Sequence, residues 1–217
     1  MVGISKYIFF DFDGTVSDAC SLTYEVLGNI FDKHEFKYSK DKLHGLMGKK
    51  MQFILKDLGI NRRKVNEIRR VFYDTLVEPF YLKKLKLCVS VDPLWDLKKE
   101  GYKLIIVSNS EKKFLKASIK QLGLDGLFYR VYGADGFLTK DVILKKLLRL
   151  FHLRGNRTIF VGDRFSDITF AHRAKMIGVA IHNKCAWSSL KKVMKEDPDY
   201  IIEDFEGLKD LIKAVKK

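Results

Sequence analysis

Near its N-terminus the chain reads KYIFFDFDGT over residues 6–15. Residues 6–12 are mostly apolar and aromatic, and Gly14 follows almost at once. A short apolar run that stops at a glycine is typical of a buried β-strand that ends in a turn. Asp11 and Asp13 are therefore expected at the end of a strand, where their carboxylates leave the core.

The second half of the chain alternates between strand and helix patterns. Apolar runs predict strands, and 3.6-residue spacing between them predicts helices. This alternation predicts a Rossmann-like, doubly wound α/β fold with a parallel sheet covered on both faces. The predicted strands span 103–107, 129–132, 158–161, 177–181 and 200–202, and the predicted helices span 92–100, 111–122, 141–151 and 166–175.

Between these two parts lies a segment in which only helical spacing is visible. Helices are expected at 17–36, 41–47, 50–58 and 62–77, with Ser39 and Asn61 as candidate N-caps. No convincing strand is expected between Gly14 and Lys86. The predicted organisation is an α/β core of residues 1–15 and 86–217, interrupted by an all-helical insert of residues 16–85.

Charge, cysteine content and the length of the apolar runs argue against some classes of protein. The formal net charge of the 217 residues is +14, but the basic residues are scattered along the chain. Scattered charge favours solvated surfaces and attraction of anions over a dedicated nucleic-acid site. The three cysteines lack a CxxC pattern, and no apolar run is long enough to cross a membrane. We expect a cytoplasmic protein with reduced thiols, without a membrane or specific nucleic-acid partner.

The residues that could take part in catalysis or ligand binding lie at or near the ends of the predicted strands. Parallel α/β sheets bind ligands at the carboxyl ends of their strands. Oxygen ligands without histidine or cysteine suit Mg²⁺, and a carboxylate can attack phosphorus while a second one transfers protons. The residues at these positions are Asp11, Asp13, Ser108, Lys140, Asp163 and Asp167.

These strand ends resemble the four motifs of the haloacid dehalogenase superfamily, in the family's order. DxDGT is present at 11–15, the Ser-Asn pair at 108–109, the lysine at 140 and GDxxxD at 162–167. The continuation at 16–18 is similar to the subgroup of phosphoglycolate phosphatases and β-phosphoglucomutases. Two positions depart from the pattern: Lys140 is followed by Asp141 instead of proline, and Ala174 by Lys175 instead of glycine.

The resemblance implies a role for each matching residue. Asp11 would be the nucleophile and Asp13 the general acid/base. Mg²⁺ would be held by Asp11, by the main-chain carbonyl of Asp13, by Asp163, and by Asp167 directly or through water. Substrate would contact Thr15, Ser108, Asn109 and Lys140. The helical insert would act as a cap over the substrate, with Lys49 as a candidate contact or, equally, as a solvated residue of a turn.

The implied activity is a magnesium-dependent phosphatase that acts on a small phosphorylated metabolite, such as a phosphoglycolate-like compound or a sugar phosphate. An aspartyl-phosphate would be the intermediate, and a monomer or homodimer is expected. A phosphomutase would use the same intermediate and remains an alternative. A phospho-accepting receiver protein and a nucleic-acid-binding protein are more distant alternatives.

Overall fold

A six-stranded parallel sheet forms the centre of the molecule. The computed structural model describes residues 3–134 and 138–216. The strand order β5-β4-β1-β6-β7-β8, in which each neighbouring pair is parallel, confirms the predicted doubly wound α/β class. The strands are β1 (Tyr7–Phe10), β4 (Lys103–Val107), β5 (Arg130–Tyr132), β6 (Ile159–Gly162), β7 (Ile177–Ile181) and β8 (Tyr200–Ile202).

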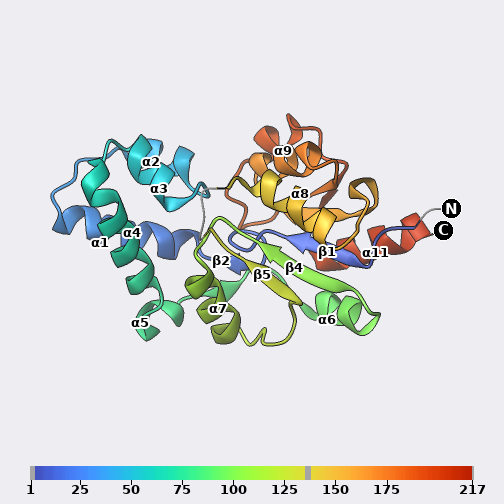
Figure 1. The fold of residues 1–217 in the computed structure, drawn as a ribbon. Helices are drawn as coiled ribbons and strands as arrows, with labels where there is room; N and C mark the ends of the chain where they lie inside the picture. The colour runs from blue at the N-terminus through green and yellow to red at the C-terminus, as the bar shows by residue number, and fades with distance from the viewer. Residues whose placement is uncertain (1–2, 135–137, 217) are drawn as a thin grey trace.

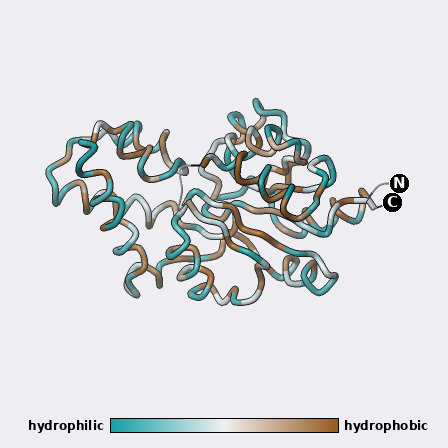
Figure 2. Tube along the Cα trace, in the orientation of Figure 1, coloured by the Kyte–Doolittle hydropathy of each residue, from teal (hydrophilic) through white to brown (hydrophobic). Residues whose placement is uncertain are grey.

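Helices cover both faces of this sheet (Figure 1). Along β1, Ile8 and Phe10 pack into one hydrophobic cluster and Phe9 into another, and none of the three is exposed to solvent. The first cluster includes residues of α6 (Asp92–Lys99), α7 (Lys112–Gln121) and α11 (Phe205–Lys216); the second includes residues of α8 (Lys140–Leu150) and α9 (Phe165–Arg173). Burial on both faces explains the unbroken apolar run of the central strand. In Figure 2 the central strands are accordingly the most hydrophobic segments.

The predicted helical segment forms a separate block beyond one end of the sheet, opposite the chain termini (Figure 1). Its helices are α1 (Cys20–Lys33), α2 (Lys40–Leu46), α3 (Met51–Asp57), α4 (Arg62–Leu76) and α5 (Pro79–Leu82). They share a hydrophobic core that includes Leu27, Leu55 and Phe72. Ser39 and Asn61 cap α2 and α4, as predicted, by accepting main-chain N–H groups.

The prediction that residues 14–86 contain no strand was wrong. A short antiparallel ribbon pairs β2 (Ser17–Asp18) with β3 (Lys86–Leu87), and the first helix begins at Cys20 instead of Ser17. Two-residue strands are too short to show an alternating pattern, and their partners lie about 70 residues apart in sequence. The ribbon joins the points where the chain enters and leaves the helical block.

Three short helical elements were also not predicted: α5, η1 (Gly155–Arg157) and α10 (Leu190–Met194). Each has five residues or fewer, which is too short to establish a helical period. Among the residues that the structure describes, no helix combines the length and apolar character needed to span a bilayer.

Candidate active site

The strand order brings three sequence-predicted positions to one edge of the sheet. Asp11 follows β1, Ser108 follows β4 and Asp163 lies just past β6. Because β1 lies between β4 and β6, these three strand ends are adjacent. From β1 the sheet is extended on one side by β4 and β5 and on the other side by β6, β7 and β8. Open α/β sheets bind ligands at the point where the strand order reverses in this way.

Three carboxylates gather in this place. Asp11, Asp163 and Asp167 each offer an oxygen, and these oxygens lie within 4.8 Å of one another among buried side chains. Burial, together with the charge of Asp167, raises the pKa of Asp11 to about 7 and that of Asp163 well above its usual range. A divalent cation would relieve the desolvation and the mutual repulsion, and an all-oxygen donor set suits Mg²⁺. The residues present therefore fit the expected ion.

Lys140 lies inside this acidic cluster. Its Nζ is 2.9 Å from Asp11 Oδ2 and 2.7 Å from Asp167 Oδ1, and the side chain is only 2% exposed. Burial alone would lower the pKa of Lys140, but the charges of the two aspartates outweigh it and the net shift is upward. Lys140 is therefore not a solvated surface lysine. The ammonium group offsets part of the negative charge next to Asp11.

Asp13 is not one of the three clustered carboxylates. Its Oδ2 accepts a hydrogen bond of 2.5 Å from the hydroxyl of Ser110, while its Oδ1 is buried without a partner among the described residues. Burial raises the pKa of Asp13 to about 6, although the bond from Ser110 opposes that shift. A carboxyl group that titrates near neutral pH suits a general acid/base. Ser110 was not predicted, because a serine near a strand end carries no local signal of its partner.

Thr15 and the turn around it orient Asp163. The Thr15 hydroxyl donates to Asp163 Oδ1 at 3.1 Å, and the main-chain N–H of Trp187 donates to Oδ2 at 2.7 Å. Gly14 has a φ of +82°, and a Cβ there would lie 2.5 Å from Asp163. The glycine of the first motif is therefore required both by its backbone angle and by the close approach of this aspartate. Thr15, expected to contact substrate, donates its hydroxyl to this carboxylate.

The remaining predicted positions lie where the helical block meets the sheet. Asn109 Nδ2 donates to the carbonyl oxygen of Gly48 at 2.8 Å. Lys49 Nζ is 2.9 Å from Asp57, and its side chain is 46% exposed. Arg164, only 6% exposed, lies so close to Gly48 that a Cβ on that glycine would be 2.4 Å from its guanidinium. The structure thus brings Asn109 and Arg164 against the same turn, while the Lys49 ammonium is paired with Asp57.

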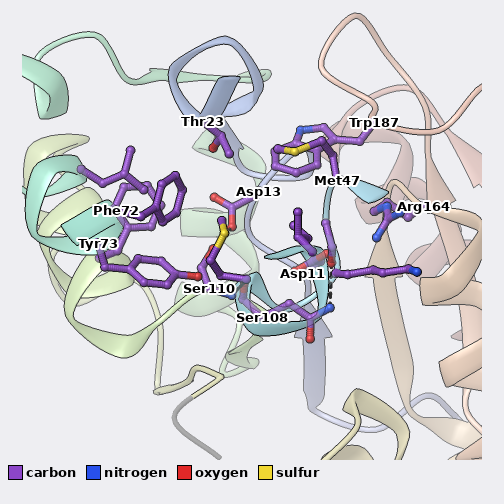
Figure 3. A pocket seen from close by; sticks show the side chains of 17 residues that line it. Asp11, Asp13, Thr23, Met47, Phe72, Tyr73, Ser108, Ser110, Arg164 and Trp187 are labelled. Atoms are coloured by element: carbon purple, nitrogen blue, oxygen red, sulfur yellow. Dashed lines mark hydrogen bonds between the residues drawn. The ribbon is translucent and has the colours of Figure 1, made fainter. Parts of the chain in front are cut away.

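A small cavity lies between these parts (Figure 3). Asp11, Asp13 and Ser108 line it from the sheet side, and Met47, Phe72 and Tyr73 are among its lining residues from the helical block. Its volume is about 30 Å³, enough for roughly two water molecules. The candidate nucleophile and acid/base thus face a small cavity that the helical block lines on its other side.

Comparisons with known proteins agree with this arrangement. A family model described as haloacid dehalogenase-like hydrolase matches residues 8–181. A Caldanaerobacter subterraneus subsp. tengcongensis protein, provisionally named pyrophosphatase PpaX, is 28% identical over 215 residues, covering 95% of this chain and 94% of the relative. A phosphoglycolate phosphatase of Psychrobacter arcticus is 22% identical over 224 residues, covering 96% of each. A crystal structure from Clostridium acetobutylicum, provisionally described as a phosphatase, superposes with a TM-score of 0.84 at 17% identity, covering 98% of this chain and 100% of that one.

Proposed function

Because the chain belongs to the haloacid dehalogenase-like hydrolase family, we propose that it is a magnesium-dependent phosphatase that acts on a small phosphorylated metabolite. The observation that carries this proposal is the buried cluster of Asp11, Asp163 and Asp167 with Lys140 between two of its members. Such a cluster combines a carboxylate nucleophile, a cation site and an ammonium group in one buried site. Relatives named as a phosphoglycolate phosphatase and a pyrophosphatase support phosphoryl chemistry.

In the proposed first step, a carboxylate oxygen of Asp11 attacks phosphorus and the bond between phosphorus and the leaving oxygen breaks. Asp13 donates its proton to that oxygen, so the product leaves as an alcohol. Lys140 and the hydroxyl of Ser108 stabilise the negative oxygens of the phosphoryl group. A Mg²⁺ ion held by Asp11, Asp163, Asp167 and the Asp13 carbonyl would add positive charge next to the same oxygens.

In the second step, water attacks the phosphorus of the aspartyl-phosphate. Asp13, now ionised, removes a proton from this water, and the bond between phosphorus and Asp11 breaks to release inorganic phosphate. Both proton transfers need a carboxyl group that is active near neutral pH. The raised pKa of Asp13, about 6, supports this role.

The helical segment, residues 16–85, is the proposed cap. The cavity of about 30 Å³ is too small for a substrate together with its phosphoryl group. Entry therefore requires the block to move away from the sheet, and its return would exclude bulk water during the reaction. The contacts of Asn109 and Arg164 with the turn at Gly48 support this closed position.

The test is phosphate release from p-nitrophenyl phosphate with Mg²⁺ or EDTA, using wild type and Asp11→Asn. Asp210→Asn, at an exposed carboxylate outside the site, is the matched control. We expect turnover that requires Mg²⁺, survives in Asp210→Asn and disappears in Asp11→Asn. Unchanged activity in Asp11→Asn would refute the mechanism. A strict requirement for a sugar bisphosphate activator would instead identify a phosphomutase.

A further inference from the structure

We infer that Arg164 selects the substrate by binding a second anionic group, a carboxylate or a phosphate, on the part of the molecule that leaves. This inference rests on the proposed phosphatase function and narrows its substrate class. Arg164 occupies a position that the GDxxxD motif at 162–167 leaves open, so the family pattern assigns it no role. Its burial, its lack of a counter-charge and its place at the cavity together point to an anionic ligand.

The guanidinium of Arg164 is buried without a counter-charge. The residue is only 6% exposed, and its Nε has no hydrogen-bond partner among the described residues. The contacts of the guanidinium are to uncharged groups: Cζ lies 5.7 Å from the centre of the Phe165 ring, and Gly48 packs against it. No ion pair joins it to a carboxylate within residues 3–134 and 138–216. A buried cation without a partner is unfavourable, so an anion that binds here removes a cost that the empty site carries.

The other cations at the site already have carboxylate partners. Lys140 is paired with two aspartates of the buried cluster, where it also meets the oxygens of the transferred phosphoryl group in the proposed mechanism. The described cavity lining contains two basic residues, Lys49 and Arg164. The Lys49 ammonium is 2.9 Å from Asp57, and its side chain is 46% exposed. Arg164 is therefore the buried cation of this lining whose charge is available for a further anion.

The cavity places Arg164 within reach of the leaving group. Asp11, Asp13 and Arg164 line the same cavity of about 30 Å³. The leaving oxygen must lie next to Asp13, its proposed proton donor, and in Figure 3 the two aspartates lie between Arg164 and Phe72. Phe72 belongs to the hydrophobic core of the helical block and offers an anion no hydrogen bond. A charged end of a short leaving group therefore lies toward Arg164.

The guanidinium is held in place by the turn that closes the site. A Cβ on Gly48 would lie 2.4 Å from it, and Asn109 holds the carbonyl oxygen of the same glycine at 2.8 Å. A guanidinium fixed in this way presents a preorganised fork of N–H groups, which suits the paired oxygens of a carboxylate or phosphate. Because Gly48 belongs to the helical block, this arrangement is complete only when the block is closed. Binding of the second anion is thus linked to closure.

The experiment compares kcat/KM of the wild-type protein for phosphoglycolate, pyrophosphate and isobutyl phosphate in the presence of Mg²⁺. Isobutyl phosphate has the branching of phosphoglycolate, but two methyl groups replace its carboxylate oxygens. We expect at least one anionic compound to exceed isobutyl phosphate ~10-fold or more, the order of a hydrogen bond to a charged group. The better of the two identifies the second anion as a carboxylate or a phosphate. Isobutyl phosphate equal to or better than both would overturn the inference and leave the phosphatase function intact.

A variant series tests the residue itself. The measured quantity is the ratio of kcat/KM for the preferred anionic compound to that for isobutyl phosphate, whose turnover also shows that a variant is folded. We expect Arg164→Met to lower this ratio at least ~10-fold. Arg164→Lys keeps the charge without the fork and should give an intermediate ratio. Arg173→Met, at an exposed position in the last turn of α9, is the matched control and should leave the ratio unchanged.

Other outcomes would overturn the inference. An equal loss of both substrates in a folded Arg164→Met protein would mean that Arg164 serves the transferred phosphoryl group. A larger fall of the ratio in Lys49→Met than in Arg164→Met would assign the second anion to the helical block. If Arg164→Met does not fold, an unchanged ratio in Arg164→Lys refutes the assignment. If wild type turns over neither p-nitrophenyl phosphate nor any of the three compounds, the proposed function fails, and the inference fails with it.

Discussion

The side-chain amide of Asn109, at the end of β4, donates a hydrogen bond of 2.8 Å to the carbonyl oxygen of Gly48 in the helical block. Arg164 packs against the other side of the same glycine. Two residues that follow β4 and β6, the strands on either side of β1, therefore hold one turn of the block over the site. The turn cannot leave its place without breaking the Asn109 bond, so closure of the cavity and the geometry of the strand ends are linked.

Replacing Gly48 should disturb this closure. Its φ of +80° is unfavourable for residues with a Cβ, and the added methyl carbon would lie 2.4 Å from Arg164. We expect Gly48→Ala to lower kcat/KM at least ~10-fold, since misplaced groups at a site commonly have effects of this order. Gly45→Ala is the control, because nothing lies within 4 Å of its added Cβ and Gly45 lies within α2. Equal activity of the two variants would contradict the importance of this contact.

Loss of the buried lysine should affect activity and stability together. Lys140→Met leaves Asp11 and Asp167 without their ammonium partner. We expect activity to disappear and the free energy of unfolding at pH 8 to fall by roughly 3–5 kcal/mol, the usual result of breaking a buried pair. The loss should be smaller at pH 5.5, where Asp11, whose pKa is raised to about 7, can take up a proton. Lys145→Met, whose ammonium is exposed and 3.7 Å from Asp141, should be nearly neutral in denaturant unfolding.

Removing the hydroxyl of Ser110 should shift the acid/base group. The bond from Ser110 lowers the pKa of Asp13, so Ser110→Ala raises it further above its ordinary value. Because the first step needs protonated Asp13, the decrease of kcat/KM on the alkaline side should move to higher pH. Ser110→Thr keeps the hydroxyl and should retain the wild-type profile. A pH profile of Ser110→Ala identical to that of wild type would argue against Asp13 as the proton donor.

Metal-free protein should lose stability as the pH rises. The pKa of Asp11 is raised from 3.8 to about 7, and that of Asp163 is raised as well, so the folded chain binds more protons than the unfolded chain in this window. Stability therefore falls between about pH 4 and pH 7. Mg²⁺ binds the ionised carboxylates and should raise Tm more at pH 8 than at pH 5.5. Thermal unfolding in EDTA and in Mg²⁺ at both pH values measures this, and a larger shift at pH 5.5 would be inconsistent with the site.

The lysine that departs from the family pattern should reduce stability. Lys175 follows the C-terminus of α9 with a φ of +58°. Its N–H bonds to His172 and that of Met176 to Ala171, a Schellman arrangement that favours glycine. We expect Lys175→Gly to stabilise the fold by roughly 1 kcal/mol without changing kcat/KM. Lys146→Gly, in the interior of α8, should instead destabilise by a similar amount, as measured by urea unfolding.

The order of strands and helices in the α/β part was predictable because the burial of each element determines the hydrophobic pattern of its own consecutive residues. The run at 6–12 is apolar on both faces because helices cover both sides of β1, and Gly14 marks its end. Asp11, Ser108 and Asp163 were recognisable because parallel strands of one sheet end at the same edge. The segments predicted as helices from residue 41 onward begin and end within about two residues of the observed limits for the same reason.

Contacts between segments that are distant in the chain could not be predicted from the sequence. The pairing of Ser17 with Leu87, the bond from Ser110 to Asp13 and the contact of Arg164 with Gly48 each depend on how separate elements pack. The contribution of the helical block to the cavity is the clearest case, because its lining residues Ile54 and Phe72 show only the spacing of ordinary core residues. Sequence alone thus determined which groups can perform the chemistry, since motif residues follow strands directly. Tertiary structure decided what faces them, since the placement of the helical block is set by packing and not by any local pattern.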